Sequence, residues 1–166
     1  MATARYNGDI RFEQLKHGHP TGVYSQYHSD GTYVYSREQT ASGLSRGEIS
    51  NATLRIHYEG EFKRLSKEGQ GTATYPDGSQ YTGQWKRNRR DGQGTLVAAT
   101  GEFWVGTFVA NKPYDGEGSL VLRDKTVITG RLTNGTFTGE VSVTFPDGTT
   151  YKGDATGCNA LNNIKL

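Results

Sequence analysis

The sequence contains very little cysteine and few aliphatic residues. The one cysteine among 166 residues, Cys158, excludes a disulfide framework and a zinc site built on cysteine ligands, and it favours a reducing, cytoplasmic compartment. No run of about 18 apolar residues is present, and the N-terminal residues lack the apolar stretch of a secretory signal, so we expect neither a transmembrane helix nor secretion. Leucine, isoleucine, valine and phenylalanine together make up less than a fifth of the chain, which is too little for an ordinary compact core.

Glycine and aromatic residues are abundant instead. The chain has 23 glycines, about twice the average share, together with 10 tyrosines, 6 phenylalanines and 2 tryptophans. The 19 basic and 17 acidic residues leave a net charge of only +2. Disordered chains combine a high net charge with few aromatic residues, so this composition predicts an ordered fold that is built without a central aliphatic core.

A repeat organises the sequence from residue 58 onward. Its units begin at Tyr58, Tyr81, Trp104 and Ile128, with a half unit at Tyr151, so that consecutive starts are 23 or 24 residues apart. Most units read aromatic-x-Gly-x-aromatic, a polar gap, Gly-x-Gly and a β-prone run, which often closes with Pro-Asp-Gly. The pattern resembles the MORN (membrane occupation and recognition nexus) repeat, whose unit is a β-hairpin of similar length.

Upstream of residue 58 the pattern is degenerate. Tyr6–Ile10 with Asp30-Gly31 resembles one unit, and residues 33–57 resemble another, in which Tyr35 stands where the first glycine belongs. We therefore divide the chain into degenerate N-terminal repeats or a cap (1–57), four full repeats plus a half (58–155) and a C-terminal tail (156–166). Whether residues 1–57 continue the array or cap it stays open, and residues 10–17 are a candidate for a short helical turn.

Alternation along the predicted strands places aromatic and aliphatic side chains on one face, and hydroxyl and charged side chains on the other. The resemblance implies an all-β fold, an elongated single-layer antiparallel sheet of stacked β-hairpins. In such a sheet, a glycine between two aromatic residues lets a ring lie flat over the backbone. A single layer cannot cover both of its faces, so we expect an aromatic groove that binds a partner segment, lined by Tyr58, Phe62, Tyr81, Trp85, Trp104 and Phe108.

Basic residues concentrate in the polar gaps of the first two full units, which are predicted hairpin tips. We predict that they form a patch for an anionic partner, which is either anionic lipid or phosphoinositide, or the acidic tails of tubulin. The alternative is a solvated loop that Glu68 and Asp91 partly neutralise. The seven residues are Lys63, Arg64, Lys67, Lys86, Arg87, Arg89 and Arg90.

The half unit predicts an unpaired edge strand, formed by Tyr151, Lys152, Gly153, Asp154 and Ala155. An edge strand exposes backbone groups that act as a template for another chain. We expect it to pair either with a second copy of this chain, as a homodimer, or with a different subunit.

No catalytic or cofactor motif is present. The Gly-x-Gly pairs lack the third glycine of a dinucleotide fingerprint and the Gly-Lys-Ser/Thr of a P-loop, and no serine stands in a Gly-x-Ser-x-Gly elbow. The 4 histidines have no acidic cluster at metal-ligand spacing, and the basic gaps lack base-stacking aromatic residues. Asp77, Asp115 and Asp147 are predicted turn residues. We therefore predict no enzyme activity, no cofactor, no metal site and no nucleic-acid partner.

The resemblance implies a role in large assemblies, because MORN-repeat proteins include radial-spoke-head subunits of the ciliary axoneme and subunits of other cytoskeletal complexes. We therefore expect a non-catalytic scaffold or adaptor in a large cytoskeletal assembly. The first expectation is the axoneme of a cilium or flagellum, in a radial spoke or a microtubule-associated complex. Two alternatives stay open: a peripheral membrane tether that binds anionic lipid, and an accessory module that acts in trans on an enzyme.

Overall fold

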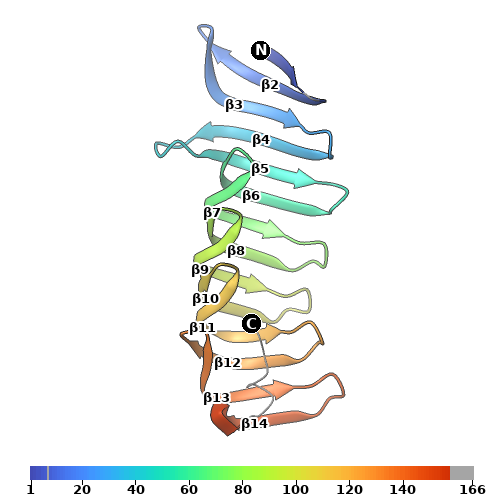
Figure 1. Cartoon of the computed structure of the whole chain (residues 1–166), viewed down its shortest axis with the longest axis vertical. Helices are drawn as coiled ribbons and strands as arrows, with labels where there is room; N and C mark the ends of the chain where they lie inside the picture. Colours follow the sequence, from blue (N-terminus) through green and yellow to red (C-terminus); the bar gives the residue numbers. More distant parts are fainter. Residues whose placement is uncertain (7, 158–166) are drawn as a thin grey trace. The chain divides into compact units, whose positions relative to one another are not determined.

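The computed structural model describes residues 1–6 and 8–157, which form one antiparallel β-sheet (Figure 1). Its 14 strands lie in the sheet in the same order as in the sequence, so every connection joins neighbouring antiparallel strands. The prediction of an all-β, single-layer antiparallel sheet is confirmed. The described residues contain no helix that is long and apolar enough to cross a membrane.

The strands fall into two groups along the sequence. Those before the full repeats are β1 (Ala2–Tyr6), β2 (Asp9–Lys16), β3 (His19–Tyr27), β4 (Thr32–Gln39) and β5 (Ser45–Asn51). Those of the full repeats and the half repeat are β6 (Ile56–Lys63), β7 (Ser66–Thr74), β8 (Gln80–Lys86), β9 (Arg89–Val97), β10 (Phe103–Val109), β11 (Lys112–Val121), β12 (Val127–Thr133), β13 (Thr136–Thr144) and β14 (Thr150–Asp154). A 3-10 helix, η1 (Ala155–Gly157), follows β14.

The chain divides into two compact units. Unit 1 comprises Met1–Gly78 and Gln84–Arg89, and unit 2 comprises Ser79–Gly83 and Arg90–Leu166. In each unit the buried aromatic and aliphatic side chains share one face of the sheet, and the side chains that alternate with them on the other face are mostly polar, with exposed apolar exceptions such as Val97 and Val105 in unit 2. We call these the inner face and the outer face.

Residues 1–57 continue the sheet and do not cap it. β5 pairs with β6, from Ser45 opposite Phe62 to Asn51 opposite Ile56. The helical turn predicted for residues 10–17 is wrong, because β2 covers nearly the whole segment and pairs with β3. Side-chain packing adds to this pairing, since the Phe12 ring lies edge-on to Tyr27 with the ring centroids 6.4 Å apart. Within the degenerate unit predicted at Tyr6–Ile10, Asn7 lies outside the described residues.

The second degenerate unit is out of phase with the prediction by one residue. In β4 the buried side chains are Val34 and Ser36, so the neighbouring Tyr35 points to the outer face. Ser36 pairs with Gly47, and the prediction that Tyr35 takes the glycine position is therefore wrong. Serine is small enough for that position, and its hydroxyl donates to the Gly22 carbonyl oxygen at 2.8 Å. Because this position holds a serine, the glycine pattern of the repeat does not reveal it.

The two glycines of a Gly-x-Gly pair have different structural roles. Gly69 has a φ of 57° and lies at the register shift of the β6–β7 hairpin, where a bulge needs a left-handed residue. Gly71 lies under the ring of Tyr58, because a Cβ at Gly71 would be 2.5 Å from the ring atoms Cε2 and Cζ. Gly94 lies under Tyr81 in the same way. The first glycine bends the hairpin, and the second makes room for the ring.

Candidate interaction surfaces

The six aromatic residues predicted to line a partner groove are core residues. Their side chains are between 0% and 5% exposed, and they are Tyr58, Phe62, Tyr81, Trp85, Trp104 and Phe108. The prediction of an open groove is wrong, because rings from successive hairpins cover one another edge-on. The ring centroids lie 5.5 Å apart for Tyr58–Trp85 in unit 1, and 5.0 Å and 6.5 Å apart for Tyr81–Phe108 and Trp104–Phe137 in unit 2.

The hydroxyl of Tyr58 is satisfied inside the hairpin that buries the ring. It donates to the carbonyl oxygen of Glu61 at 2.6 Å and lies 3.3 Å from that of Glu68. Burial of the phenol, together with the nearby charges of Glu61 and Glu68, raises the pKa of Tyr58. The tyrosine therefore stays neutral and serves the fold, and it is not a candidate acid or base.

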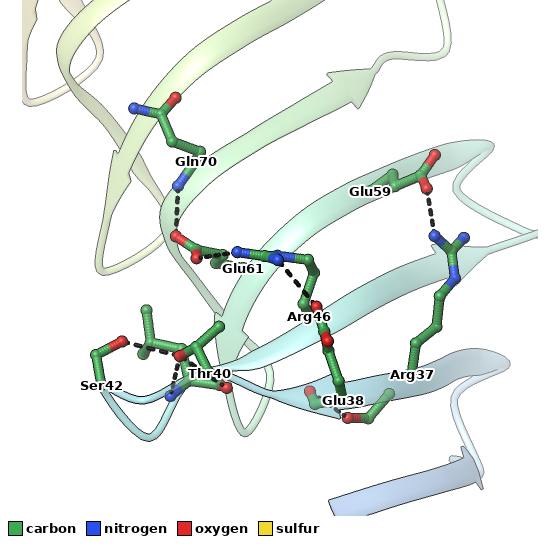
Figure 2. A network of polar contacts seen from close by, with 10 residues as sticks. Arg37, Glu38, Thr40, Ser42, Arg46, Glu59, Glu61 and Gln70 are labelled. Carbon is green, nitrogen blue, oxygen red and sulfur yellow. Dashed lines mark hydrogen bonds and ion pairs between the residues drawn. The ribbon is translucent and has the colours of Figure 1, made fainter.

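The outer face of unit 1 carries a network of charged side chains (Figure 2). Arg46 bridges Glu38 and Glu61 at 2.9 Å and 3.0 Å, and Arg37 pairs with Glu59 at 2.8 Å. Glu61 also accepts the backbone N–H of Gln70 at 3.0 Å, and this hydrogen bond, followed by Arg46, holds the pKa of Glu61 below its ordinary value. These charges compensate one another across β4, β5 and β6, so the network helps to hold the three strands together.

A ladder of hydrogen bonds ties the tips of the β8–β9, β10–β11 and β12–β13 hairpins to the hairpin before each of them, and the sequence analysis did not predict it. In unit 1, Asn88 at the tip of β8–β9 donates its N–H to the Lys67 carbonyl at 3.1 Å and accepts the Lys67 N–H on Oδ1 at 2.8 Å. Glu68 accepts the N–H of Arg87 on Oε1 at 3.1 Å. We call this set of contacts the tip ladder.

The tip ladder repeats within unit 2. Asn111 donates its N–H to the Arg90 carbonyl at 2.9 Å and accepts the Arg90 N–H at 3.0 Å. Asp91 accepts the N–H of Ala110 at 3.2 Å, and Asp115 accepts that of Asn134 at 2.8 Å. The prediction that Asp115 is a turn residue is wrong, because it lies within β11 and binds the following turn. The sequence signal that indicates the tip ladder is an acidic residue directly before Gly-x-Gly.

Two of the seven predicted patch residues pack on core rings. The Nζ atom of Lys67 lies 5.5 Å from the ring centroids of both Tyr58 and Trp85, and burial lowers the pKa of Lys67. In unit 2 the Arg90 guanidinium lies 5.7 Å and 5.5 Å from the rings of Tyr81 and Phe108. Both therefore act as cation–π covers of the inner face.

The other five basic residues lie exposed at two neighbouring hairpin tips of unit 1. They are Lys63, Arg64, Lys86, Arg87 and Arg89, and we call them the basic tip. In the described part of the chain, none of the five forms an ion pair. Glu68 was predicted to neutralise part of this charge, but its carboxylate accepts the backbone N–H of Arg87 and forms no ion pair with these side chains. Five cations without counter-ions thus remain on one edge.

The predicted edge strand is present as β14, which pairs with β13 and stands last in the sheet. It is short, and its outer-face side chains include Lys152. Charge and short length are features by which proteins protect sheet edges from other chains. Ala155 lies in η1 and is 5% exposed, so it is not part of the strand as predicted. Of the predicted tail, residues 158–166 lie outside the described residues, and Cys158 is among them.

Two of the polar residues weighed as candidate catalytic or metal sites, His28 and Asp147, have structural partners. His28 Nδ1 lies 2.8 Å from Asp9 Oδ2, and the other oxygen of Asp9 accepts the N–H of Ser29 at 3.0 Å. Asp147 accepts the N–H of Thr149 at 2.9 Å, as expected of a turn residue. Within residues 1–6 and 8–157, no group of three or more His, Cys, Asp or Glu side chains is placed to hold a metal ion.

Comparison with known proteins identifies two MORN repeats in this chain. Residues 58–80 and 81–103 match the family model of the MORN repeat, and they contain β7, β9 and most of β6 and β8. No curated protein matches the chain. Among solved structures, the TCP domain of Drosophila melanogaster SAS-4 (dCPAP), in complex with a proline-rich motif of Ana2 (dSTIL), is similar over 86% of this chain and 88% of its own, with 14% sequence identity and a TM-score of 0.40. A likeness at that TM-score carries no argument about function.

Proposed function

We propose that this chain is a non-catalytic MORN-repeat scaffold that holds acidic protein segments against the basic tip. We place it in the cytoplasm as a subunit of a large cytoskeletal assembly, with the axoneme of a cilium or flagellum, in a radial spoke or microtubule-associated complex, as the first candidate. The observation that carries the proposal is the basic tip itself, five exposed cations with no ion-pair partner in the described part of the chain.

The geometry of the tip favours a charged, extended partner. The tip ladder binds the backbone of Arg87 and Asn88 to β7, so the two tips are held side by side before any partner arrives. Clustered charges of one sign raise the local concentration and the association rate of an oppositely charged ligand. The described face offers no deep apolar pocket for a single anchor, because the aromatic residues are buried. The acidic C-terminal tails of tubulin have the required chemistry.

Microtubule co-sedimentation tests this proposal. We expect the wild-type chain to sediment with microtubules, to lose at least ten-fold in affinity when the acidic tails are removed by limited proteolysis, and to weaken further in high salt. The variant K86E/R87E/R89E should show the same loss of affinity for intact microtubules. The matched control is R123E/K125E, which reverses two exposed charges at the β11–β12 turn of unit 2. Equal binding of tailless microtubules, or of the tip variant, would contradict the proposal.

One further observation favours a second candidate, a peripheral membrane tether. Leu65 is 45% exposed at the tip of the β6–β7 hairpin, directly after Arg64. An apolar side chain among cations suits the interface of an anionic bilayer. Flotation with phosphatidylserine vesicles separates the two candidates, because L65D should abolish membrane binding and leave the binding of acidic tails intact. Vesicle binding that is unaffected by both L65D and the charge reversals would remove this candidate.

A further inference from the structure

Ser66 lies at the tip of the β6–β7 hairpin, within the basic tip. It is the first residue of β7 and pairs with Lys63, the last residue of β6, so that Arg64 and Leu65 form the turn between them. The serine is partly exposed, and its hydroxyl lies 3.4 Å from Glu68 Oε1, which is longer than an ordinary hydroxyl hydrogen bond. Ser66 is therefore a weakly held hydroxyl at a surface turn.

The residues before Ser66 have the charge pattern that basophilic protein kinases recognise. Lys63 and Arg64 stand three and two residues before the serine, and no other serine of the chain has a lysine or an arginine at either position. Such kinases bind their substrates in an acidic groove, so that cations at these positions decide which serine is selected. Within the described part of the chain, neither Lys63 nor Arg64 forms an ion pair, and both can therefore enter an acidic groove.

The turn that carries Ser66 is less restrained than the neighbouring turn of the basic tip. A kinase binds its substrate as an extended segment, so the turn must open locally. Asn88 in the β8–β9 turn is joined to the Lys67 carbonyl by a backbone hydrogen bond, whereas among the described residues none joins Arg64 or Leu65 to another hairpin. Arg64 also has a φ of 59°, which disfavours a residue with a Cβ. The β6–β7 turn can therefore open without breaking contacts to other hairpins.

We propose that Ser66 is a phosphorylation site of a basophilic protein kinase and that its phosphate switches off the basic tip. The kinase transfers the γ-phosphoryl group of ATP to Ser66 Oγ. The bond between the γ-phosphorus and the bridging oxygen breaks, a bond to Oγ forms, a kinase carboxylate takes the hydroxyl proton, and ADP leaves. The modification is independent of the proposed function, and only its effect on an acidic partner rests on that function.

A phosphate on Ser66 lies among the cations that it neutralises. Lys63 stands directly opposite, at a Cβ separation of about 4.5–5.5 Å, which allows an ion pair. The phosphate carries a charge of about −1.5 to −2, so the five cations of the basic tip keep a net charge of only about +3. It also repels the nearby carboxylate of Glu68, which accepts the N–H of Arg87 in the tip ladder. Both effects weaken the attraction of an acidic partner.

Phosphorylation of the full chain in vitro tests the site. We treat the folded protein with ATP and the catalytic subunit of cAMP-dependent protein kinase, and locate phosphate by mass spectrometry. We expect phosphate on Ser66, at a rate at least ten-fold lower in K63Q/R64Q. The matched control is Ser42, which is more exposed in the β4–β5 turn but lacks cations at the two positions. Absence of phosphate on Ser66, equal modification of Ser42, or an unchanged rate in K63Q/R64Q would overturn the inference.

Two further measurements separate the effect of the phosphate from the proposed function. Amide exchange needs no partner: the N–H of Arg87 should exchange at least ten-fold faster in the phosphorylated chain and stay unchanged in S66A treated in the same way. In microtubule co-sedimentation, phosphorylation should weaken binding at least ten-fold, again with treated S66A as the control. If the unmodified chain does not bind microtubules, the proposed function fails and the exchange decides the inference. Unchanged exchange at Arg87, or undiminished binding by a phosphorylated chain that bound before, would contradict the inference.

Discussion

Replacement of Gly71 by alanine tests how the tyrosine core is built. The Tyr58 ring is 0% exposed and lies over Gly71, where a Cβ would come 2.5 Å from Cε2 and Cζ. Forcing an extra carbon into a packed core costs about 1–3 kcal/mol. Moving the ring would also break the hydrogen bond from the Tyr58 hydroxyl to Glu61, worth about 1 kcal/mol. We therefore expect G71A to lower the free energy of unfolding by about 3 kcal/mol.

Thermal and urea unfolding followed by circular dichroism measure this effect. For a chain of this length, about 3 kcal/mol corresponds to a fall in Tm of roughly 6–12 °C. The matched control is G18A, a hairpin-turn glycine with a φ of 82° and nothing within 4 Å of its Cβ position. It should lose only the cost of a left-handed alanine, about 1 kcal/mol.

A double-mutant cycle makes the test specific to the ring. In a Y58L background the clash partner is absent, so G71A should cost at least about 1 kcal/mol less than it does in wild type. Equal costs of G71A in the two backgrounds, or a cost no larger than that of G18A, would refute the idea that the glycine makes room for the tyrosine.

Three further predictions concern the contacts around this core. N88A should lower the free energy of unfolding by about 1–2 kcal/mol, whereas N88G keeps the left-handed turn and loses only the side-chain hydrogen bond to Lys67. Amide exchange at Lys67 should be faster in both variants if the tip ladder is correct, and unchanged exchange would contradict it. The folded-state pKa of Glu61 lies below its ordinary value of 4.5, so the carboxylate stabilises the fold above that pH and the contribution is lost as the pH falls through the folded-state pKa. The Tm of wild type should therefore fall more steeply than that of E61Q below about pH 5. Parallel curves of Tm against pH would argue against this. W85F should cost about 1 kcal/mol more than W104F, because Trp85 Nε1 donates to the Gly71 carbonyl at 2.9 Å while Trp104 Nε1 has no partner among the described atoms; equal melting curves for the two variants would speak against this reason.

The repeat and its alternation predicted the hairpins, because the positions of glycine and aromatic residues follow directly from strand geometry. Tyr58, Gly60 and Gly71 lie where the pattern indicates, and the ring covers the second glycine of the pair. The pattern stops at local geometry. It does not predict that Ser36 takes the glycine position. A serine is tolerated there because its small side chain is buried and its hydroxyl donates a hydrogen bond to a backbone carbonyl oxygen.

The candidate surface was harder to predict than the fold. Charge counting grouped Lys67 and Arg90 with the basic tip, but a long cationic side chain can fold back onto a ring, and only the packing reveals that it does. The burial of Trp85 and Phe108 likewise depends on rings from different hairpins, which no single repeat contains. The tip ladder joins residues about one repeat apart, so it is invisible within any one unit.

The aromatic residues form the core, and we propose that partners bind at the basic tip. An NMR titration of the full chain with an oligoglutamate peptide tests it most directly, because the peptide carries the charge of an acidic tail and little else. We expect salt-sensitive amide shifts confined to Lys63, Arg64 and residues 86–89, and none in K86E/R87E/R89E. Shifts centred on Tyr58, Tyr81 and Trp104, or a peptide that binds the charge-reversed variant equally well, would contradict it.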